Sequence, residues 1–174
     1  MQRWVALLRG VNVGGGNRVP MAELRTALAE RGFDGVRSYI ASGNLVLGGD
    51  GPAERIAAEV RAALSEGFGV DVPVLVLPGE TVGAILADCP FDGEGKTIHA
   101  FFCFGDPVID SDARDRWIAA SETLAVRGRT VWLHAPDGIG RSALAERIGR
   151  VVTGTDLTAR NLNTVRKLAA MAAE

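Results

Sequence analysis

The sequence contains few of the residues that build metal sites, disulfides or catalytic nucleophiles. Two cysteines and two histidines occur among 174 residues, and no CxxC pair or His/Cys ligand spacing connects them, which argues against a zinc site. Cys103 lies inside an apolar run, as expected of a small buried residue. Paired carboxylates and a Ser/His/Asp order with local context are also missing. The sequence therefore indicates no metal, leaves any cofactor unknown, names no catalytic residue and does not decide whether the protein is an enzyme.

Long apolar runs are missing as well. No uncharged apolar stretch approaches the roughly 18 to 20 residues that a membrane span requires. Arg9 interrupts the first apolar run, which reaches no small-residue cleavage site, so the N-terminus lacks a signal-peptide pattern. We expect a cytoplasmic protein without a membrane partner.

The composition that remains is typical of a globular protein, with 47% hydrophobic and 23% charged residues and a net charge of −2. The charge is unevenly distributed. Segment 123–173 holds eight basic residues against three acidic ones, and the rest of the chain is net acidic. A basic C-terminal third suits an anionic ligand or nucleic acid. Because no compact basic run occurs, scattered solvated arginines are the alternative.

Hydrophobic periodicity predicts the order strand, helix, strand, strand, helix, strand in the first half. The predicted strands are 3–9, 36–40, 45–47 and 72–77, and the predicted helices are 20–31 and 53–67. Pro20 near the start of the first helix and Gly32 after its end are typical of helix boundaries. This order is that of the split-βαβ, or ferredoxin-like, arrangement.

The second half shows a similar order. Its predicted strands are 97–104, 123–126 and 130–134, and its predicted helices are 112–120 and 142–149. Either 151–152 or 157–159 supplies the last strand, and 164–173 forms a short closing helix. No close residue identity relates the two halves, so the repeat is inferred from the order of elements alone.

The predicted fold class is therefore α+β, with two tandem ferredoxin-like modules and a short C-terminal helix. The expected boundaries are 1–78 for the first module, 79–95 for a helical connector, and 96–174 for the second module with its closing helix. The aromatic residues Trp4, Phe101, Trp117 and Trp132 stand in apolar periodic contexts. We expect them in the core rather than stacked on nucleic-acid bases.

The most polar connection is the loop Arg9–Asn17, which follows the first strand and contains three consecutive glycines. Glycine admits left-handed backbone conformations and close approach to a ligand, and exposed backbone N–H groups of such a loop can converge on an anion. No Gly-Lys-Ser/Thr follows, so the loop is not a P-loop. The alternative is a structural loop whose asparagines cap turns.

Three further polar segments stand out. Ser42-Gly43-Asn44 joins two predicted strands and fits a hairpin turn that could present Ser42 and Asn44 beside the opening loop. Gly138–Ser142 leads into a predicted helix with Ser142 as its N-cap. In Thr158–Thr164, Asn161 or Asn163 caps the closing helix, and Arg160 pairs with an anion or a carboxylate.

Together these segments predict a polar cleft between the two modules that binds an anionic small molecule, with a nucleotide as one form. The candidate ligand-binding residues are Arg9, Asn12, Gly14, Gly15, Asn17, Ser42, Asn44, Gly140, Arg141, Ser142, Arg160, Asn161 and Asn163. Arginine suits this role because its planar fork pairs phosphate or carboxylate at two points.

Five blocks in order carry a resemblance to a known family. They are Ala6–Gly15, Pro20–Arg25, Val36–Asn44, Gly138–Ser142, and Thr158–Asn161 with Asn163–Val165. The chain resembles, over nearly its whole length, the bacterial domain-of-unknown-function family 1697. The resemblance implies a duplicated ferredoxin-like unit and implies that the four polar loops are recurring positions of the family, but it brings no activity.

The chain departs from the family at three positions. Gly16 stands where members often have a lysine or another polar residue, Ala143 replaces a common lysine, and Leu162 replaces a common tryptophan. The two missing lysines lower the positive charge near the loops.

Three other functions remain open on the sequence. A nucleic-acid-binding module would use the basic C-terminal third, although the Lys/Arg-Gly-Phe pattern of an RNA-binding sheet is absent. A phosphoryl- or acyl-transfer enzyme would use the same cleft through electrostatic stabilisation. Alternatively, the asparagine loops only lock the modules together, because asparagine amides satisfy backbone groups where segments cross. The oligomeric state is not readable from the sequence.

Overall fold

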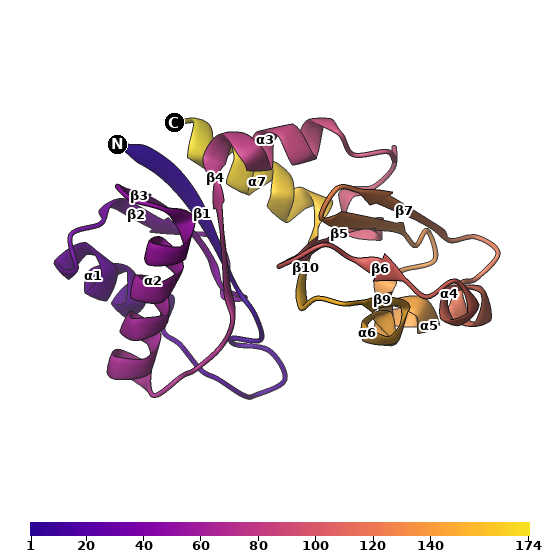
Figure 1. Cartoon of the computed structure of the whole chain (residues 1–174), viewed down its shortest axis with the longest axis horizontal. Coiled ribbons are helices and arrows are strands. Elements are labelled where there is room, and N and C mark those ends of the chain that lie inside the picture. The colour runs from indigo at the N-terminus through magenta and orange to yellow at the C-terminus, as the bar shows by residue number, and fades with distance from the viewer. The chain divides into compact units, whose positions relative to one another are not determined.

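The computed structural model describes all residues from Met1 to Glu174 and shows a mixed α+β protein (Figure 1). The chain divides into two compact units. The first unit comprises Met1–Ala84 and Arg166–Glu174, and the second comprises Ile85–Val165. The divisions fall inside helices α3 (Gly79–Ala87) and α7 (Leu162–Ala173). Most of the closing helix, which was expected to belong with the second module, thus groups with the first unit.

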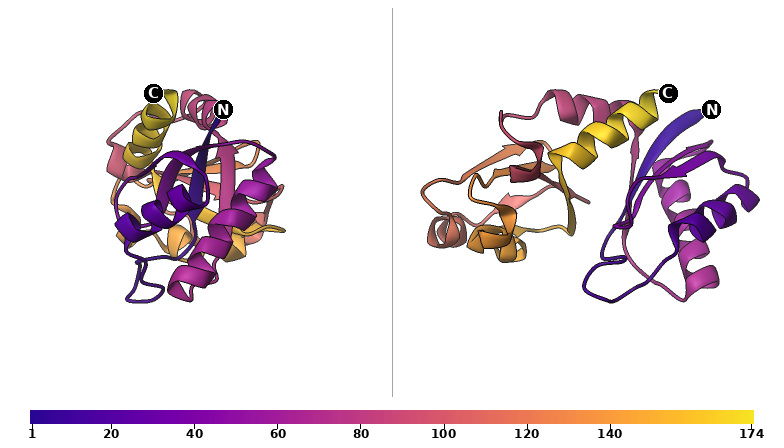
Figure 2. Two further views of the ribbon diagram at one scale, coloured as in Figure 1. Left: turned by 90° about the vertical axis from the view of Figure 1, so that its left-hand side faces the viewer. Right: turned by 180° about the vertical axis from the view of Figure 1, so that it is seen from behind.

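The first unit is built on a four-stranded antiparallel sheet in the order β2-β3-β1-β4. Its strands are β1 (Gln2–Leu8), β2 (Asp34–Ser38), β3 (Asn44–Gly49) and β4 (Val74–Pro78). Helices α1 (Met21–Glu30) and α2 (Ala53–Phe68) cover one face of this sheet (Figures 1 and 2). Strands and helices follow one another in the predicted order, with boundaries shifted by a few residues.

Side-chain alternation along the central strand creates the core of the first unit. Trp4, Ala6 and Leu8 of β1 point to one face, where they pack against buried residues of both helices, among them Leu28 and Leu64. The helices end where glycine follows, at Gly32 with φ +93° and at Gly69 with φ +64°, because glycine adopts this left-handed conformation without steric cost.

The second unit contains another four-stranded antiparallel sheet, in the order β10-β5-β8-β7. Its strands are β5 (Ile98–Cys103), β7 (Thr123–Arg127), β8 (Thr130–His134) and β10 (Leu157–Asn161). A two-stranded ribbon adds β6 (Val108–Ile109) and β9 (Val152–Thr153). The helices are α4 (Ser111–Trp117), α5 (Ala143–Glu146) and α6 (Ile148–Val151), with short 3-10 turns η1 (Gly95–Thr97) and η2 (Ile139–Arg141).

Two details of the second unit differ from the sequence prediction. The single helix expected at 142–149 is two short helices that break at Arg147, where φ −109° and ψ 24° depart from α-helical values. Both candidates for the last strand form strands. Residues 157–161 complete the sheet beside β5, whereas 152–153 pair with β6 in the ribbon.

The aromatic residues expected in the core are mostly buried. Trp4, Phe101 and Trp132 have exposed fractions of 7%, 4% and 0%. Trp117 is only half-buried, and the guanidinium groups of Arg116 and Arg147 lie over its ring at 5.8 and 5.4 Å. Trp117 thus packs against the edge of the core of the second unit and also makes cation–π contacts with these two arginines.

The C-terminal residues pack closely onto the start of α3 within the first unit. A Cβ atom at Gly79 would lie 2.8 Å from the Cβ of Ala172, so glycine permits the two helices to approach. Across the whole chain, the helices are either too short or too polar to cross a membrane.

Gly43, at the β2–β3 turn, provides a test of close packing in the first unit. It has φ +90°, and a Cβ there would lie 2.5 Å from Val11 Cγ2 and 2.7 Å from Leu8 Cβ. Replacing Gly43 by alanine should lower the free energy of unfolding by about 3 kcal/mol, since the new methyl group meets core atoms at a left-handed φ. Urea unfolding measures the change.

Gly67 is the control, because it lies in α2 with open space at its Cβ position. Gly67→Ala should raise the free energy of unfolding by about 0.5–1 kcal/mol, since alanine is the better helix former. Similar effects of the two substitutions would contradict tight packing at Gly43.

Candidate functional site

The opening loop depends on left-handed backbone conformations. Gly10, Gly14 and Gly15 have φ of +72°, +62° and +78°, and Asn12 and Asn17 have φ of +54° and +49°. Asparagine is one of the few residues with a side chain that visits this region readily. Both the glycines and the asparagines of this loop therefore allow the positive φ angles that its backbone adopts.

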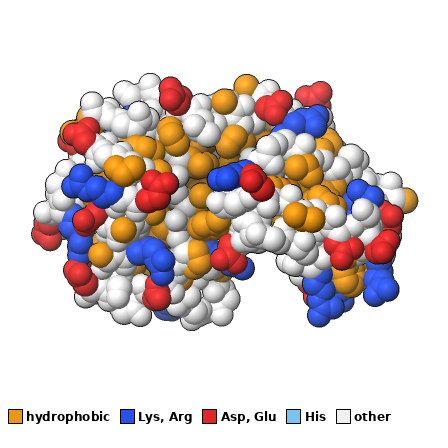
Figure 3. Space-filling view, viewed as in Figure 1, with side chains coloured by type: hydrophobic (Ala, Val, Ile, Leu, Met, Phe, Trp, Pro, Cys, Tyr) orange, Lys and Arg blue, Asp and Glu red, His pale blue; other side chains and the backbone are white.

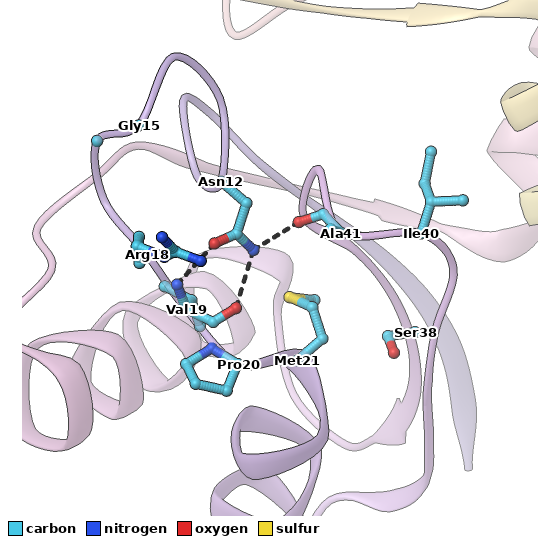
Figure 4. Close-up of a pocket in the computed structure, with 10 residues that line it drawn as sticks. Asn12, Gly15, Arg18, Val19, Pro20, Met21, Ser38, Ile40 and Ala41 are labelled. Atoms are coloured by element: carbon cyan, nitrogen blue, oxygen red, sulfur yellow. Dashed lines mark hydrogen bonds between the residues drawn. The ribbon is translucent and has the colours of Figure 1, made fainter.

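The carboxamide of Asn12 fastens the loop to two other segments. Its Nδ2 donates hydrogen bonds to the carbonyl oxygens of Val19 (2.8 Å) and Ala41 (2.7 Å), and its Oδ1 accepts one from the Val19 N–H (2.8 Å). Figure 4 shows Asn12 between the segment that enters α1 and the β2–β3 turn. Both amide hydrogens are thus used inside the protein, and Asn12 acts as a positioning residue for the loop.

A second asparagine orders the β2–β3 turn. Asn44 is fully buried, and its Nδ2 donates to the Tyr39 carbonyl (3.0 Å) and to Ser42 Oγ (3.3 Å). The Gly43 carbonyl accepts a hydrogen bond from the Leu8 N–H (2.9 Å). The turn is therefore held both internally and against the end of β1, beside the opening loop.

Between these fixed points, Ile40 adopts an unfavourable conformation. Its φ is +51° and its side chain is 53% exposed. A left-handed conformation costs a residue with a Cβ roughly 1–2 kcal/mol, and β-branching makes it rarer still. Since the side chain is largely outside the core, packing does not repay this cost.

A pocket of about 810 Å³ lies between the opening loop and the β2–β3 turn. Its walls are Asn12, Gly15, Gly16, Arg18 and Val19 from the loop, Pro20 and Met21 at the start of α1, and Ser38, Ile40 and Ala41 from β2 and the turn (Figure 4). All ten residues belong to the first unit.

Arg18 is the one charged residue in this pocket, hereafter the loop pocket. Its side chain is exposed and makes no ion pair or hydrogen bond within the protein. The N–H of Gly15 likewise has no partner in the chain. No carboxylate lines the pocket, and Val19, Pro20, Met21, Ile40 and Ala41 give it a largely apolar wall. The pocket therefore offers unpaired donors and one positive charge beside an apolar surface.

Of the predicted ligand-binding residues in the first unit, two line this pocket and the others lie in the same loop, in the β2–β3 turn or at the end of β1. Asn12 and Gly15 line it, and Gly14 and Asn17 lie in the same loop. Arg9 is exposed at the end of β1, and Ser42 and Asn44 form the turn.

Sequence reasoning missed Arg18, Ser38 and Ile40. The position of Arg18, between the glycines and a helix start, was the available signal. The other two were hidden inside a predicted strand at 36–40, which ends at Ser38.

The predicted residues of the second unit are mostly engaged in structure. Ser142 is buried, and its Oγ accepts a hydrogen bond from the Ala145 N–H (3.0 Å), so it is the helix N-cap that the sequence predicted. Gly140 and Arg141 lie in the preceding 3-10 turn, and Arg141 is exposed.

The segment at β10 and α7 is also closely bonded. Asn161 Oδ1 accepts a hydrogen bond from the Thr164 N–H (2.9 Å) at the start of α7, as predicted. The guanidinium of Arg160 donates to Thr158 Oγ1 (2.7 Å) and to the Ala159 carbonyl (2.8 Å). Burial lowers the pKa of Arg160 to about 10, so it remains charged at neutral pH. Asn163 is exposed on α7, and its carboxamide lies where a Cβ on Gly95 would be.

Two other titratable groups of the second unit are perturbed by burial alone. Desolvation lowers the pKa of His99 and raises that of the Cys103 thiol to about 11. Cys103 is therefore a protonated, buried thiol at neutral pH. No group of three or more His, Cys, Asp or Glu side chains is arranged to hold a metal ion.

Comparison with known families decides where the protein belongs. The family model described as "Protein of unknown function (DUF1697)" matches residues 1–132. The chain belongs to the DUF1697 family. The match includes every residue of the loop pocket, so the pocket lies in the part of the chain that defines its DUF1697 membership.

A solved structure shares the fold of this DUF1697 protein. It is described as the conserved bacterial protein SP0830 from Streptococcus pneumoniae, with 24% sequence identity and a TM-score of 0.76. The alignment covers 100% of this chain and 99% of that one. No curated protein matches the sequence.

The bonding of Asn12 predicts a stability difference between two asparagines of the loop. Asn12→Ala should lower the free energy of unfolding by about 2 kcal/mol more than Asn17→Ala, because three hydrogen bonds are lost rather than one. The carboxamide of Asn17 makes a single bond, to the Gly10 carbonyl at 3.2 Å. Both residues have φ near +50°, so the backbone penalty of alanine cancels. Equal losses in urea unfolding would contradict the locking role of Asn12.

The conformation of Ile40 predicts a stabilising substitution. Ile40→Asn should raise the free energy of unfolding by about 1 kcal/mol, since asparagine tolerates a left-handed φ and little packing is lost. Val13→Asn is the matched control, because Val13 is 56% exposed without a positive φ. Differential scanning calorimetry should show a higher Tm for the Ile40 variant only. A gain in both variants would attribute the effect to removal of exposed apolar surface.

Proposed function

We propose that the first unit binds a small anionic molecule in the loop pocket, with Arg18 as the anchor of the anionic group. The observation that carries this proposal is an exposed arginine without an internal partner in a pocket that has no carboxylate. Arginine presents five donors in a planar fork that fits phosphate or carboxylate oxygens. The N–H of Gly15 supplies a further donor on the same side of the pocket, as glycine-rich loops do for anions.

The apolar wall indicates what the rest of the ligand is. Met21, Ile40 and Ala41 line the side of the pocket away from Arg18 (Figure 4). Ligand pockets commonly combine such apolar walls with a few orienting polar groups. The proposed ligand therefore has an anionic group attached to a flat or apolar body, and a nucleotide is one molecule of this class.

The strained Ile40 supports the same proposal. Unfavourable backbone conformations cluster at binding sites, where the surrounding structure maintains them. Here Asn12 holds the Ala41 carbonyl on one side of Ile40 and Asn44 holds the Tyr39 carbonyl on the other. The two asparagines thus present an apolar side chain at the rim of the pocket.

The other functions that the sequence left open have less support. The loop pocket contains no His, Cys, Asp or Glu that could serve as a general base, so we propose binding rather than phosphoryl or acyl transfer. On the face drawn in Figure 3, basic and acidic side chains are interspersed, which is a weak basis for nucleic-acid binding. The sequence also left open that the asparagine loops lock the two modules together. The bonds of Asn12 and Asn44 described above support a locking of segments inside the first unit, which is compatible with a ligand in the pocket that they shape.

We further propose that the two units are copies of one ferredoxin-like unit in a cytoplasmic protein. Strands β5, β7, β8 and β10 occupy the same order in their sheet as β1, β2, β3 and β4 do in theirs. The cytoplasmic location is supported by two unpaired cysteines, Cys89 and Cys103.

Replacement of Arg18 tests the proposed function. Isothermal titration calorimetry with inorganic phosphate, pyrophosphate and AMP should show binding to the wild-type protein. In Arg18→Ala the affinity should fall about tenfold or more, because charge-assisted hydrogen bonds are lost.

Arg61→Ala is the matched control, since Arg61 is an exposed arginine of the same unit that pairs with Asp71 at 2.7 Å. Its affinity should equal that of the wild type. The proposal is wrong if Arg18→Ala binds these anions as tightly as the wild type, or if both variants lose affinity equally.

A further inference from the structure

A second pocket of the first unit lies on the other side of Ser38. It has a volume of about 380 Å³ and takes its basic side chains from three elements: Arg25 of α1, Arg37 of β2 and Lys167 of α7. Glu174 is its one acidic lining residue. Three positive charges against one negative charge distinguish this basic pocket from the loop pocket, which has a single cation.

The donors of the basic pocket are only partly used within the protein. Arg25 donates one hydrogen bond to Ser38 Oγ, and four of its N–H groups remain for other partners. Lys167 is exposed and has no ion pair or hydrogen bond. The phenol of Tyr39 also lines the pocket and makes no hydrogen bond in the chain. The pocket can therefore offer at least three side chains to one anion.

Arg37 and Glu174 show how an anion is already accommodated in this pocket. The guanidinium of Arg37 is ion-paired with the Glu174 carboxylate and donates a hydrogen bond to the Met171 carbonyl. The side chains of Arg37 and Glu174 are 36% and 63% exposed, and exposed pairs of this kind contribute little to stability. A phosphate carries more charge and more acceptor oxygens than a carboxylate, so it can displace Glu174 from Arg37.

Ser38 connects the two pockets. It is the residue that lines both of them, at the end of β2. The pockets therefore adjoin at one side chain, with Arg18 on one side and Arg25, Arg37 and Lys167 on the other. A ligand seated in the loop pocket therefore has the basic pocket as its neighbour across Ser38.

We infer that the basic pocket binds a second anionic group of the ligand held in the loop pocket. The substrate class is then a small molecule with two separated anionic groups, such as a nucleoside that carries phosphates at two positions. This inference rests on the proposed function for its first anionic group. Glu174 occupies the second position in the unliganded protein and competes with the ligand.

Two-dimensional ¹H–¹⁵N NMR with inorganic phosphate tests each pocket separately at constant ionic strength. Two groups of amides should shift, one at residues 15–18 and one at residues 37–39 and 167–171. Lys167→Ala should weaken the phosphate affinity measured at residues 37–39 and 167–171 at least threefold and leave the affinity measured at residues 15–18 unchanged. Arg18→Ala should do the reverse. Arg61→Ala is the control and should change neither response.

Glu174→Gln gives the opposite change at the same pocket. It removes the competing carboxylate while keeping the size of the side chain. The phosphate affinity measured at residues 37–39 and 167–171 should therefore rise about twofold or more. A variant that merely loosened α7 would lower this affinity.

Calorimetry with adenosine 3′,5′-bisphosphate and AMP tests whether one ligand fills both pockets. The bisphosphate should bind at least tenfold more tightly to the wild type, and Lys167→Ala should abolish that advantage without changing the affinity for AMP. The inference is overturned if residues 37–39 and 167–171 do not respond to phosphate, or if the bisphosphate has no advantage. Absence of the response at residues 15–18 would instead overturn the proposed function of the loop pocket.

Discussion

The carboxamide of Asn12 is the interaction on which the candidate site depends. One side chain joins the opening loop, the segment that enters α1 and the β2–β3 turn through three hydrogen bonds of 2.7–2.8 Å. The loop has three glycines in succession, and glycine loses more conformational entropy on ordering than any other residue. Without a fixed point in its middle, such a loop would occupy many conformations. Asn12 selects one of them, and that conformation leaves a cavity between the loop and the turn.

This arrangement separates the residues that shape the pocket from those that are available to a ligand. The asparagines have most of their polar atoms bonded to the backbone, as buried polar groups generally must. Arg18 and the N–H of Gly15 keep their donors unused. Ile40 is exposed and so available to a ligand, but its backbone conformation depends on the asparagines on either side of it. The apparent abundance of polar residues in these loops therefore reflects two different physical requirements.

Much of the architecture followed from the sequence because its signals are local. Alternation along β1, the apolar stripes of α1 and α2, and the glycines that end them are all readable within one element. The N-cap role of Ser142 was equally local. The break in the helix at Arg147 could not be predicted from local signals, because weak helix formers such as Gly149 are often tolerated inside helices. The two candidates for the last strand could not be told apart because each is short.

The candidate site was only partly predictable, because its walls come from segments distant in sequence. The glycine-rich loop was visible as a polar segment, but the sequence could not show that Asn12 bonds to Val19 and Ala41 rather than to a ligand. Arg18 became a candidate only when the structure showed that it lacks a partner. The basic pocket was even less accessible, since Arg37 and Lys167 are separated by most of the chain and meet only in the folded first unit.

The division of the first unit into Met1–Ala84 and Arg166–Glu174 has a consequence for biosynthesis. During translation, the loop pocket can form as soon as the first of these segments has left the ribosome, because all its residues lie before position 42. The basic pocket lacks Lys167 until the whole second unit has been synthesised. Domains generally fold in the order of their synthesis. The segment from Arg166 onward therefore docks onto strands and helices that were synthesised earlier, and the basic pocket is completed after the loop pocket.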